Sequence, residues 1–188
     1  FVINIIDEKK INKFNLLGHS MGGKVVMQFD LNHPNIAHKI VIVDIAPKFY
    51  PVHHSLILEG LNSLDVAHLE NRQAANEHMK RFEDNEGVRQ FLLKNLHRTG
   101  ENGFEWKINL QVITKNIDVV GLELWVHQPS ETPAIFIKGA ESHYIQPEDQ
   151  RLISEIFPNF ELFEIPQASH WVQADQPVAF LEVINSIL

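Results

Sequence analysis

A serine flanked by glycines stands between a short apolar run and a run of residues compatible with a helix. The spacing is Gly18-x-Ser20-x-Gly22, with a third glycine at Gly23. A sharp turn from strand to helix would strain the backbone at Ser20 and expose its Oγ, and side chains at both flanking glycine positions would crowd the turn. The helix dipole and the Met21 backbone N–H would then favour an oxyanion beside this hydroxyl. The pattern predicts a serine nucleophile, although a glycine-rich turn without chemistry has the same spacing.

A serine hydroxyl is a weak nucleophile until a base removes its proton, so we expect one of the eleven histidines to be that base. His170 lies in the segment Ser169-His170-Trp171, between a strand-like run and the closing helix-like run. The order serine, acid, histidine along the chain is typical of a nucleophile elbow followed by its partners. We predict His170 as the base, with a plain loop residue as the alternative. We expect the His19 side chain to point away from the site and to be structural.

The acid that would orient the histidine has several candidates. Asp44 directly follows the β-branched run 40–43, at the edge where a parallel sheet assembles its sites. Ser142 and Glu141 follow a later apolar run that ends at Gly139. A neutral serine does not stabilise an imidazolium as a carboxylate does, and Glu141 is expected to point elsewhere. A cap of the following turn is the alternative role for Asp44, so the residues alone leave the choice open.

The order of predicted elements places the chain in the α/β class. Apolar runs predict strands at 13–17, 40–43, 134–138 and 160–165, and periodic segments predict helices at 1–10, 22–32, 148–157 and 177–188. Consecutive strand, helix and strand favour a mostly parallel sheet. We therefore predict a core of residues 1–48 and 131–188 with a helical cap or lid insertion at 49–130.

The insertion lacks any signal for a parallel strand. Within it the sequence predicts helices at 56–69 after a Ser55 cap, 74–82, 86–96, 113–120 and 122–126, a turn at 100–103 and a short strand at 105–109. Aromatic residues of this region and of the histidine loop are candidates to contact an acyl chain. The candidates for substrate binding are Phe91, Trp125 and Trp171.

Composition excludes several classes of function. The net charge of −8 argues against a nucleic-acid partner, and the chain has no run of transmembrane length and no signal-peptide pattern. The absence of cysteine excludes a disulfide framework and a thiolate nucleophile, and it is compatible with a cytoplasmic location. His53 and His54 lack matching carboxylates, so we expect no metal site.

The segment Leu17–Gly23 together with Ala168–Trp171 resembles the α/β-hydrolase superfamily. The segments Val43–Pro47, Glu86–Lys94 and Gly139–Ser142 are similar to those of the small bacterial esterases of the YbfF type, relatives of lipases and acyl thioesterases. The resemblance covers essentially the whole chain.

The resemblance implies an α/β-hydrolase fold and a cofactor-free serine carboxylesterase or acyl thioesterase acting on a small, short-to-medium acyl ester or thioester. It also implies Asp44 as the acid, with Ser142 as an auxiliary hydrogen-bonding residue near His170. Two other hypotheses stay open: another cofactor-free hydrolase-fold chemistry, such as a haloperoxidase or C–C hydrolase, and a non-catalytic binding module.

The chain opens at Phe1 inside a helix-like segment. By the resemblance, the first strands of the fold are expected to be missing from it, together with the loop that normally supplies a second oxyanion N–H. The strand at 13–17 would then present a free edge, and we expect the chain alone to self-associate through that edge or to have weak activity.

Overall fold

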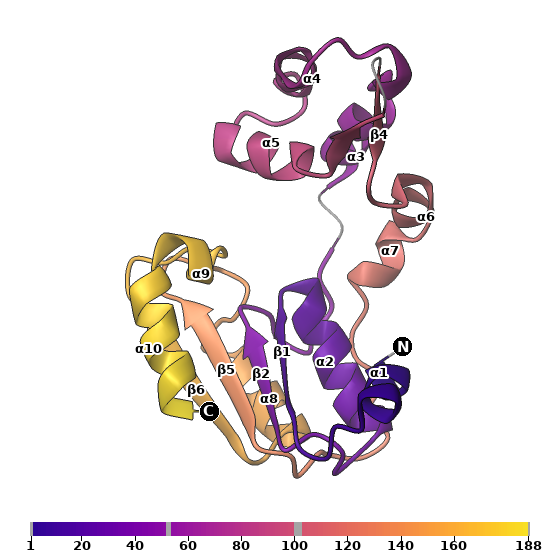
Figure 1. Cartoon of the computed structure of the whole chain (residues 1–188). Helices are drawn as coiled ribbons and strands as arrows, with labels where there is room; N and C mark the ends of the chain where they lie inside the picture. The colour runs from indigo at the N-terminus through magenta and orange to yellow at the C-terminus, as the bar shows by residue number, and fades with distance from the viewer. Residues whose placement is uncertain (1, 52–53, 100–102, 188) are drawn as a thin grey trace. The chain divides into compact units, whose positions relative to one another are not determined.

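Four parallel strands form the main sheet of the protein (Figure 1). The structure, a computed structural model, describes residues 2–51, 54–99 and 103–187. The strand order is β1-β2-β5-β6, with bounds Asn15–His19, Lys39–Val43, Ala134–Gly139 and Phe160–Ile165. The two central strands are almost wholly buried, as expected for parallel strands covered on both faces. The predicted α/β class with a parallel sheet is confirmed.

Helices pack on both faces of this sheet (Figure 1). They are α2 (Met21–Asn32), α8 (Asp149–Ile156), α9 (Val172–Asp175) and α10 (Pro177–Ile187). Helix α1 (Val2–Lys9) precedes β1 and buries none of its residues. Side chains alternate between the two faces along a strand. One face presents Val41, Val43 and Ile137 to α9 and α10. On the other face, Ile42 lies against α2, and Phe136 packs on Phe157 at the end of α8.

The chain divides into two compact units, residues 1–49 with 123–188 and residues 50–122. The second unit contains helices α3 (Ser55–Asn62), α4 (Arg72–Met79), α5 (Glu86–Leu93), α6 (Leu110–Lys115) and α7 (Ile117–Val120), a 3-10 turn at Val66–His68, and the antiparallel pair β3 (Leu96–Arg98) and β4 (Phe104–Trp106). Its own core is built mainly from leucines, with Ala75, Met79 and Phe104. Each unit therefore buries an apolar core of its own.

Several boundaries predicted for the second unit were wrong. The helix predicted over 56–69 ends at Asn62, and its N-cap is His54 rather than Ser55. Residues 122–126 are not helical, because α7 ends at Val120 and the carbonyl of its C-cap, Gly121, accepts a 2.8 Å hydrogen bond from the Tyr50 N–H. The strand β3 was missed, and most of the predicted turn at 100–103 lies outside the described residues, as does His53.

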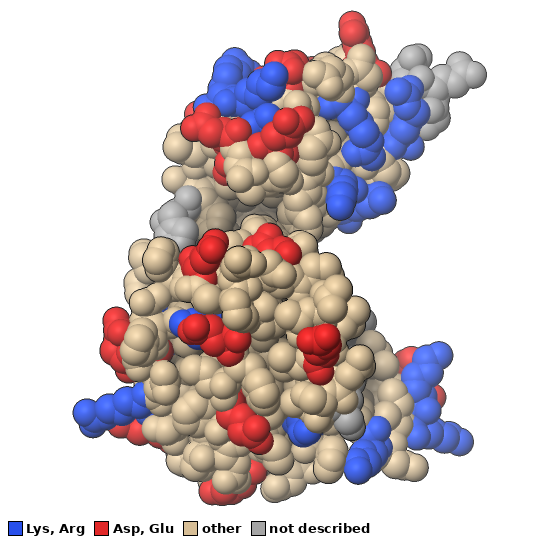
Figure 2. All heavy atoms as spheres, turned by 90° about the vertical axis from the view of Figure 1, so that its left-hand side faces the viewer, with Lys and Arg blue, Asp and Glu red and all other residues tan. Residues whose placement is uncertain are grey.

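On the unit that carries the sheet, the charged side chains of the face shown in Figure 2 do not gather into one patch of a single sign. Acidic residues are scattered there among uncharged ones, which matches a net charge that is negative but moderate. Within the described part of the chain, no helix combines the length and the apolar character needed to cross a membrane. Strand β1 is an edge strand of the described sheet, and self-association through it stays a prediction.

The glycines around Ser20 differ in why they are needed. A Cβ added at Gly18 would lie 2.2 Å from the carbonyl oxygen of Gly22, so no side chain fits there. At Gly23 it would lie 2.6 Å from Ile45, which shows how closely α2 packs on the sheet. A Cβ at Gly22 meets nothing within 4 Å, so the predicted crowding at that position is wrong.

These contacts predict different outcomes for two matched substitutions. Gly18→Ala should lower the free energy of unfolding by about 2–4 kcal/mol, because the overlap is with backbone that cannot move aside cheaply. Gly22→Ala should stay within about 1 kcal/mol of wild type, since alanine also favours the helix. Urea unfolding followed by circular dichroism measures both, and equal losses in the two variants would contradict the assignment.

Candidate active site

Ser20 occupies the turn between β1 and α2 in a strained backbone conformation. Its φ is 55° and its ψ is −121°, a region that residues with a side chain rarely adopt. The strain is held by neighbours: the Ser20 N–H donates to the Val43 carbonyl at 2.9 Å, and the Ser20 carbonyl accepts from the Gly23 N–H at 2.8 Å. The backbone therefore presents Oγ at the carboxyl end of β1 as the sequence predicts.

Asp44 stands at the matching position one strand further into the sheet. In the parallel register, His19 of β1 pairs with Val43 of β2, so Ser20 and Asp44 are the first residues beyond two adjacent strands. Asp44 also has a positive φ of 51°, which aspartate tolerates better than most residues, and its N–H donates to the Ile137 carbonyl at 2.8 Å. The sheet edge thus brings together two residues separated by helix α2.

His170 comes from the loop between β6 and α9. The loop crosses close to the end of β5, where a Cβ added at Gly139 would lie 2.3 Å from the Ser169 carbonyl oxygen. Ser169 is itself held by Asp175, whose Oδ2 accepts from the Ser169 N–H at 2.8 Å and from its Oγ at 2.5 Å. Glycine at position 139 is therefore required for the close approach of the histidine loop.

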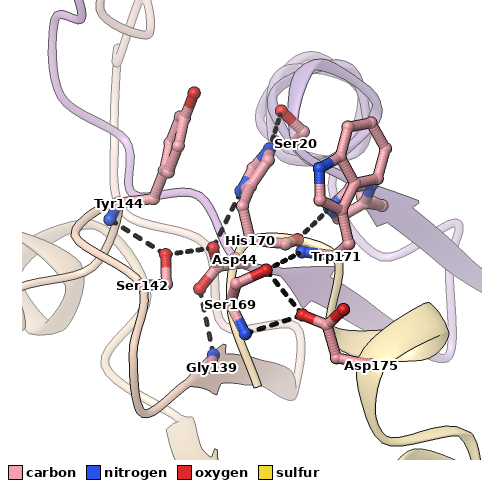
Figure 3. Close-up of polar contacts among 10 residues, drawn as sticks. Ser20, Asp44, Gly139, Ser142, Tyr144, Ser169, His170, Trp171 and Asp175 are labelled. Atoms are coloured by element: carbon pink, nitrogen blue, oxygen red, sulfur yellow. Dashed lines mark hydrogen bonds and ion pairs between the residues drawn. The ribbon is translucent and has the colours of Figure 1, made fainter. Parts of the chain in front are cut away.

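The three side chains form one hydrogen-bonded series (Figure 3). His170 Nδ1 lies 2.8 Å from Asp44 Oδ2, and His170 Nε2 lies 2.9 Å from Ser20 Oγ. A carboxylate only accepts, so Nδ1 carries the proton, and the neutral ring then offers the Nε2 lone pair to the serine hydroxyl. The geometry selects the tautomer that a general base for Ser20 needs.

Asp44 has no exposure to solvent and gains two further donors. The Gly139 N–H donates to Oδ1 at 3.1 Å, and the Ser142 hydroxyl donates to Oδ2, the oxygen that also binds His170. Ser142 Oγ in turn accepts from the Tyr144 N–H at 3.2 Å. The sequence predicted Ser142 near His170. In the structure its hydroxyl binds Asp44, the carboxylate that also binds His170.

Aromatic rings surround the His170 imidazole (Figure 3). The Tyr144 ring stacks on it with centroids 3.8 Å apart and planes 18° apart, and the Trp171 ring lies edge-on at 5.7 Å. Burial raises the pKa of the Tyr144 phenol, and the nearby Asp44 charge adds to this, so the phenol stays protonated at neutral pH. Tyr144 was missed in the sequence, where its position two residues after Ser142 was the only available signal.

His19 contacts the site, contrary to the expectation that its side chain points away. Its Nε2 lies 2.7 Å from the His170 carbonyl oxygen, and its ring centroid lies 4.7 Å from that of the His170 imidazole. Burial lowers the pKa of His19 from its ordinary value of 6.5, and the bond to the His170 carbonyl opposes this in part. The neutral form of the ring is therefore favoured in the folded protein.

This lowered pKa predicts a pH dependence of stability. As the pH falls below 6.5, the unfolded chain protonates His19 before the folded chain does, so its contribution to stability is present above that pH and is lost as the pH falls through the folded pKa. His19→Gln should therefore lose less free energy of unfolding than wild type between about pH 7.5 and about pH 5.5. Urea unfolding at the two pH values measures the difference, and an identical loss in both proteins would refute it.

The remaining predicted site residues are Met21, Trp125 and Phe91. Met21 is the first residue of α2, where a helix provides no acceptor for the backbone N–H, so this donor lies next to Ser20. Trp125 is largely exposed, and its backbone pairs with the Gln28 side chain, further along α2, at 2.9 and 3.1 Å. Phe91 lies on α5 in the second unit. For Trp125 and Phe91, a role in substrate binding stays a prediction.

Side chains suited to a metal do not gather elsewhere in the described ranges. Over residues 2–51, 54–99 and 103–187, no group of three or more His, Asp or Glu side chains is arranged to hold a metal ion.

The parallel sheet with a serine at a strained strand-to-helix turn defines the class of this protein as an α/β hydrolase fold. The chain belongs to the alpha/beta hydrolase family, whose pattern matches residues 2–183. The resemblance stated from the sequence is confirmed.

Individual relatives agree with this assignment. The chain is 34% identical to esterase YbfF of Escherichia coli over 192 residues, which covers 100% of this chain and 72% of the relative. It is 33% identical to the sn-1-specific diacylglycerol lipase ABHD11 of Danio rerio, covering 98% of this chain and 60% of the relative. A solved marine microorganism esterase is 36% identical, with a TM-score of 0.95 over 100% of this chain and 74% of that one. The chain thus spans about 60% of the length of the diacylglycerol lipases that it matches.

Proposed function

We propose that the chain carries the active site of a serine carboxylesterase that cleaves short-to-medium acyl esters or thioesters. Ser20 is the nucleophile, His170 the general base and Asp44 the acid that orients it. The observation that carries the proposal is the hydrogen-bonded series from Asp44 through His170 to Ser20, with Ser20 held at a φ of 55°. Relatives named as esterases and lipases support the same reaction class.

Acylation begins when His170 Nε2 takes the proton of Ser20 Oγ as that oxygen attacks the acyl carbonyl carbon. The carbonyl oxygen becomes an oxyanion, which the Met21 N–H and the N-terminal end of α2 stabilise. Asp44 stabilises the imidazolium through Nδ1. The tetrahedral intermediate then breaks its bond to the leaving oxygen or sulfur, which takes the proton from His170, and Ser20 is left as an acyl ester.

Deacylation repeats these steps with water. His170 takes a proton from a water molecule as its oxygen attacks the acyl-enzyme carbonyl, and the same N–H donor meets the second oxyanion. The intermediate releases Ser20 Oγ, which recovers its proton from His170, and the carboxylic acid leaves. No cofactor enters the cycle. Residues 49–130 act as the cap of this site in the proposal, with Phe91, Trp125 and Trp171 contacting the acyl chain.

The first test is covalent labelling of the activated serine. A fluorophosphonate probe reacts with a serine hydroxyl whose proton is removed by a base. We expect intact-mass spectrometry to detect one adduct on the wild-type chain and none on Ser20→Ala. An unlabelled wild type, or an adduct that persists in Ser20→Ala, would contradict the proposal.

The second test separates the acid from the auxiliary residue. Asp44→Asn should lower kcat on a nitrophenyl ester by about 10³- to 10⁴-fold, because the amide cannot stabilise the imidazolium and favours the wrong tautomer. Ser142→Ala should cost only about 10-fold, since Asp44 keeps its bonds to Gly139 and His170.

The reverse order of effects, with Ser142→Ala the more damaging, would reject Asp44 as the acid. Paired oxygen and sulfur esters with the same acyl group then show which leaving group the site prefers. Circular dichroism of both variants checks that the fold is retained.

A further inference from the structure

We infer that His19 is a positioning residue, which holds the main chain of the general base at a fixed distance from the nucleophile through its hydrogen bond to the His170 carbonyl. The inference rests on the proposed function and extends it to a residue outside the catalytic series. It starts from one contact, His19 Nε2 to His170 O at 2.7 Å, between residues 151 positions apart in the chain.

The two atoms in this contact determine which one is the donor. A carbonyl oxygen only accepts, so Nε2 of His19 carries a hydrogen and donates it. The ring is partly buried, tilted by 39° to the His170 imidazole and 5.6 Å from the Trp171 ring. This packing holds the donor in place, so the bond is a directed one rather than a surface contact.

The position of His19 next to Ser20 explains why its hydrogen bond to the His170 carbonyl matters. His19 is the last residue of β1 and directly precedes Ser20, so its backbone is as fixed as the sheet. Two other bonds to the main chain of the His170 loop come from elsewhere: Asp175, in the same stretch of chain, accepts from the Ser169 N–H at 2.8 Å, and the Glu141 N–H, after β5, donates to the Ala168 carbonyl at 2.9 Å. His19 instead ties the loop to the strand that carries the nucleophile.

A tie of this kind controls the distance over which the proton moves. The imidazole reaches Ser20 Oγ at 2.9 Å, and a shift of about 1 Å in such a pair can cost on the order of 100-fold in rate. The hydrogen bond of His19 goes to the His170 carbonyl, whereas Ser20 Oγ is bound by His170, so in this inference His19 acts through the base and not on the reacting atoms. Its removal should therefore lower kcat and leave KM nearly unchanged.

Two variants of similar length separate the donor from the ring. His19→Gln keeps an N–H donor on a flexible chain, and His19→Met has the same reach without a donor. We expect His19→Met to lower kcat on a nitrophenyl ester, and the rate of fluorophosphonate labelling, by about 10- to 100-fold, with KM within about 2-fold of wild type. His19→Gln should recover most of that loss. His33→Phe, at an exposed position beyond the end of α2, is the matched control and should behave as wild type.

Several outcomes would overturn the inference. His19→Met at the wild-type rate would show that the bond is dispensable, and His19→Gln as slow as His19→Met would show that the ring and not the donor matters. His19→Phe is a second donor-free variant should the methionine variant not fold. Nitrogen NMR of the imidazoles is a readout that does not depend on activity. A His19 tautomer with its proton on Nδ1 would reject the hydrogen bond to the His170 carbonyl. This result can be told apart from failure of the proposed function, which the absence of fluorophosphonate labelling would show.

Discussion

A carboxylate without solvent contact is the group on which the rest of the site depends. Burying an ionised carboxylate is strongly unfavourable unless hydrogen bonds replace its hydration. Asp44 meets this requirement with three donors from two segments: the Gly139 N–H and the Ser142 hydroxyl at the end of β5 and just after it, and the His170 imidazole from the loop after β6. Because these donors come from the end of β5, the loop after it and the loop after β6, Asp44 links those segments at the same time as it orients the His170 imidazole.

The strands make this convergence possible. Parallel pairing aligns the ends of β1, β2 and β5 at one edge, so that Ser20, Asp44 and Gly139 each stand at or just beyond a strand end. Ser20 and Asp44 both have a strained backbone with positive φ. The N–H group of each donates to a carbonyl of the neighbouring strand. Local conformations that would be unfavourable in isolation are thereby maintained by the sheet.

The sequence allowed prediction of those parts of the site that depend on local pattern. Ser20, Asp44 and His170 each follow an apolar run, and strand ends in a parallel sheet meet at one edge. The contacts of His19 and Tyr144 could not be predicted, because both depend on where the loop that carries His170 returns to the sheet. The ends of the short helices in the second unit also depend on tertiary contacts, as the Gly121–Tyr50 bond shows. Glycine itself was a partial guide: Gly18 is sterically required, whereas Gly22 is not.

The bond between Tyr50 and Gly121 closes the second unit at its base. The two points where the chain enters and leaves residues 50–122 are in direct contact, since an added Cβ at Gly121 would lie 2.1 Å from the Tyr50 carbonyl oxygen. Because its two ends are in contact, the unit is equivalent to one closed loop inserted into the chain that forms the sheet. The entropic cost of closing such a loop rises only slowly with its length. Evolution can therefore lengthen, shorten or exchange this unit with little effect on the geometry of Ser20, Asp44 and His170.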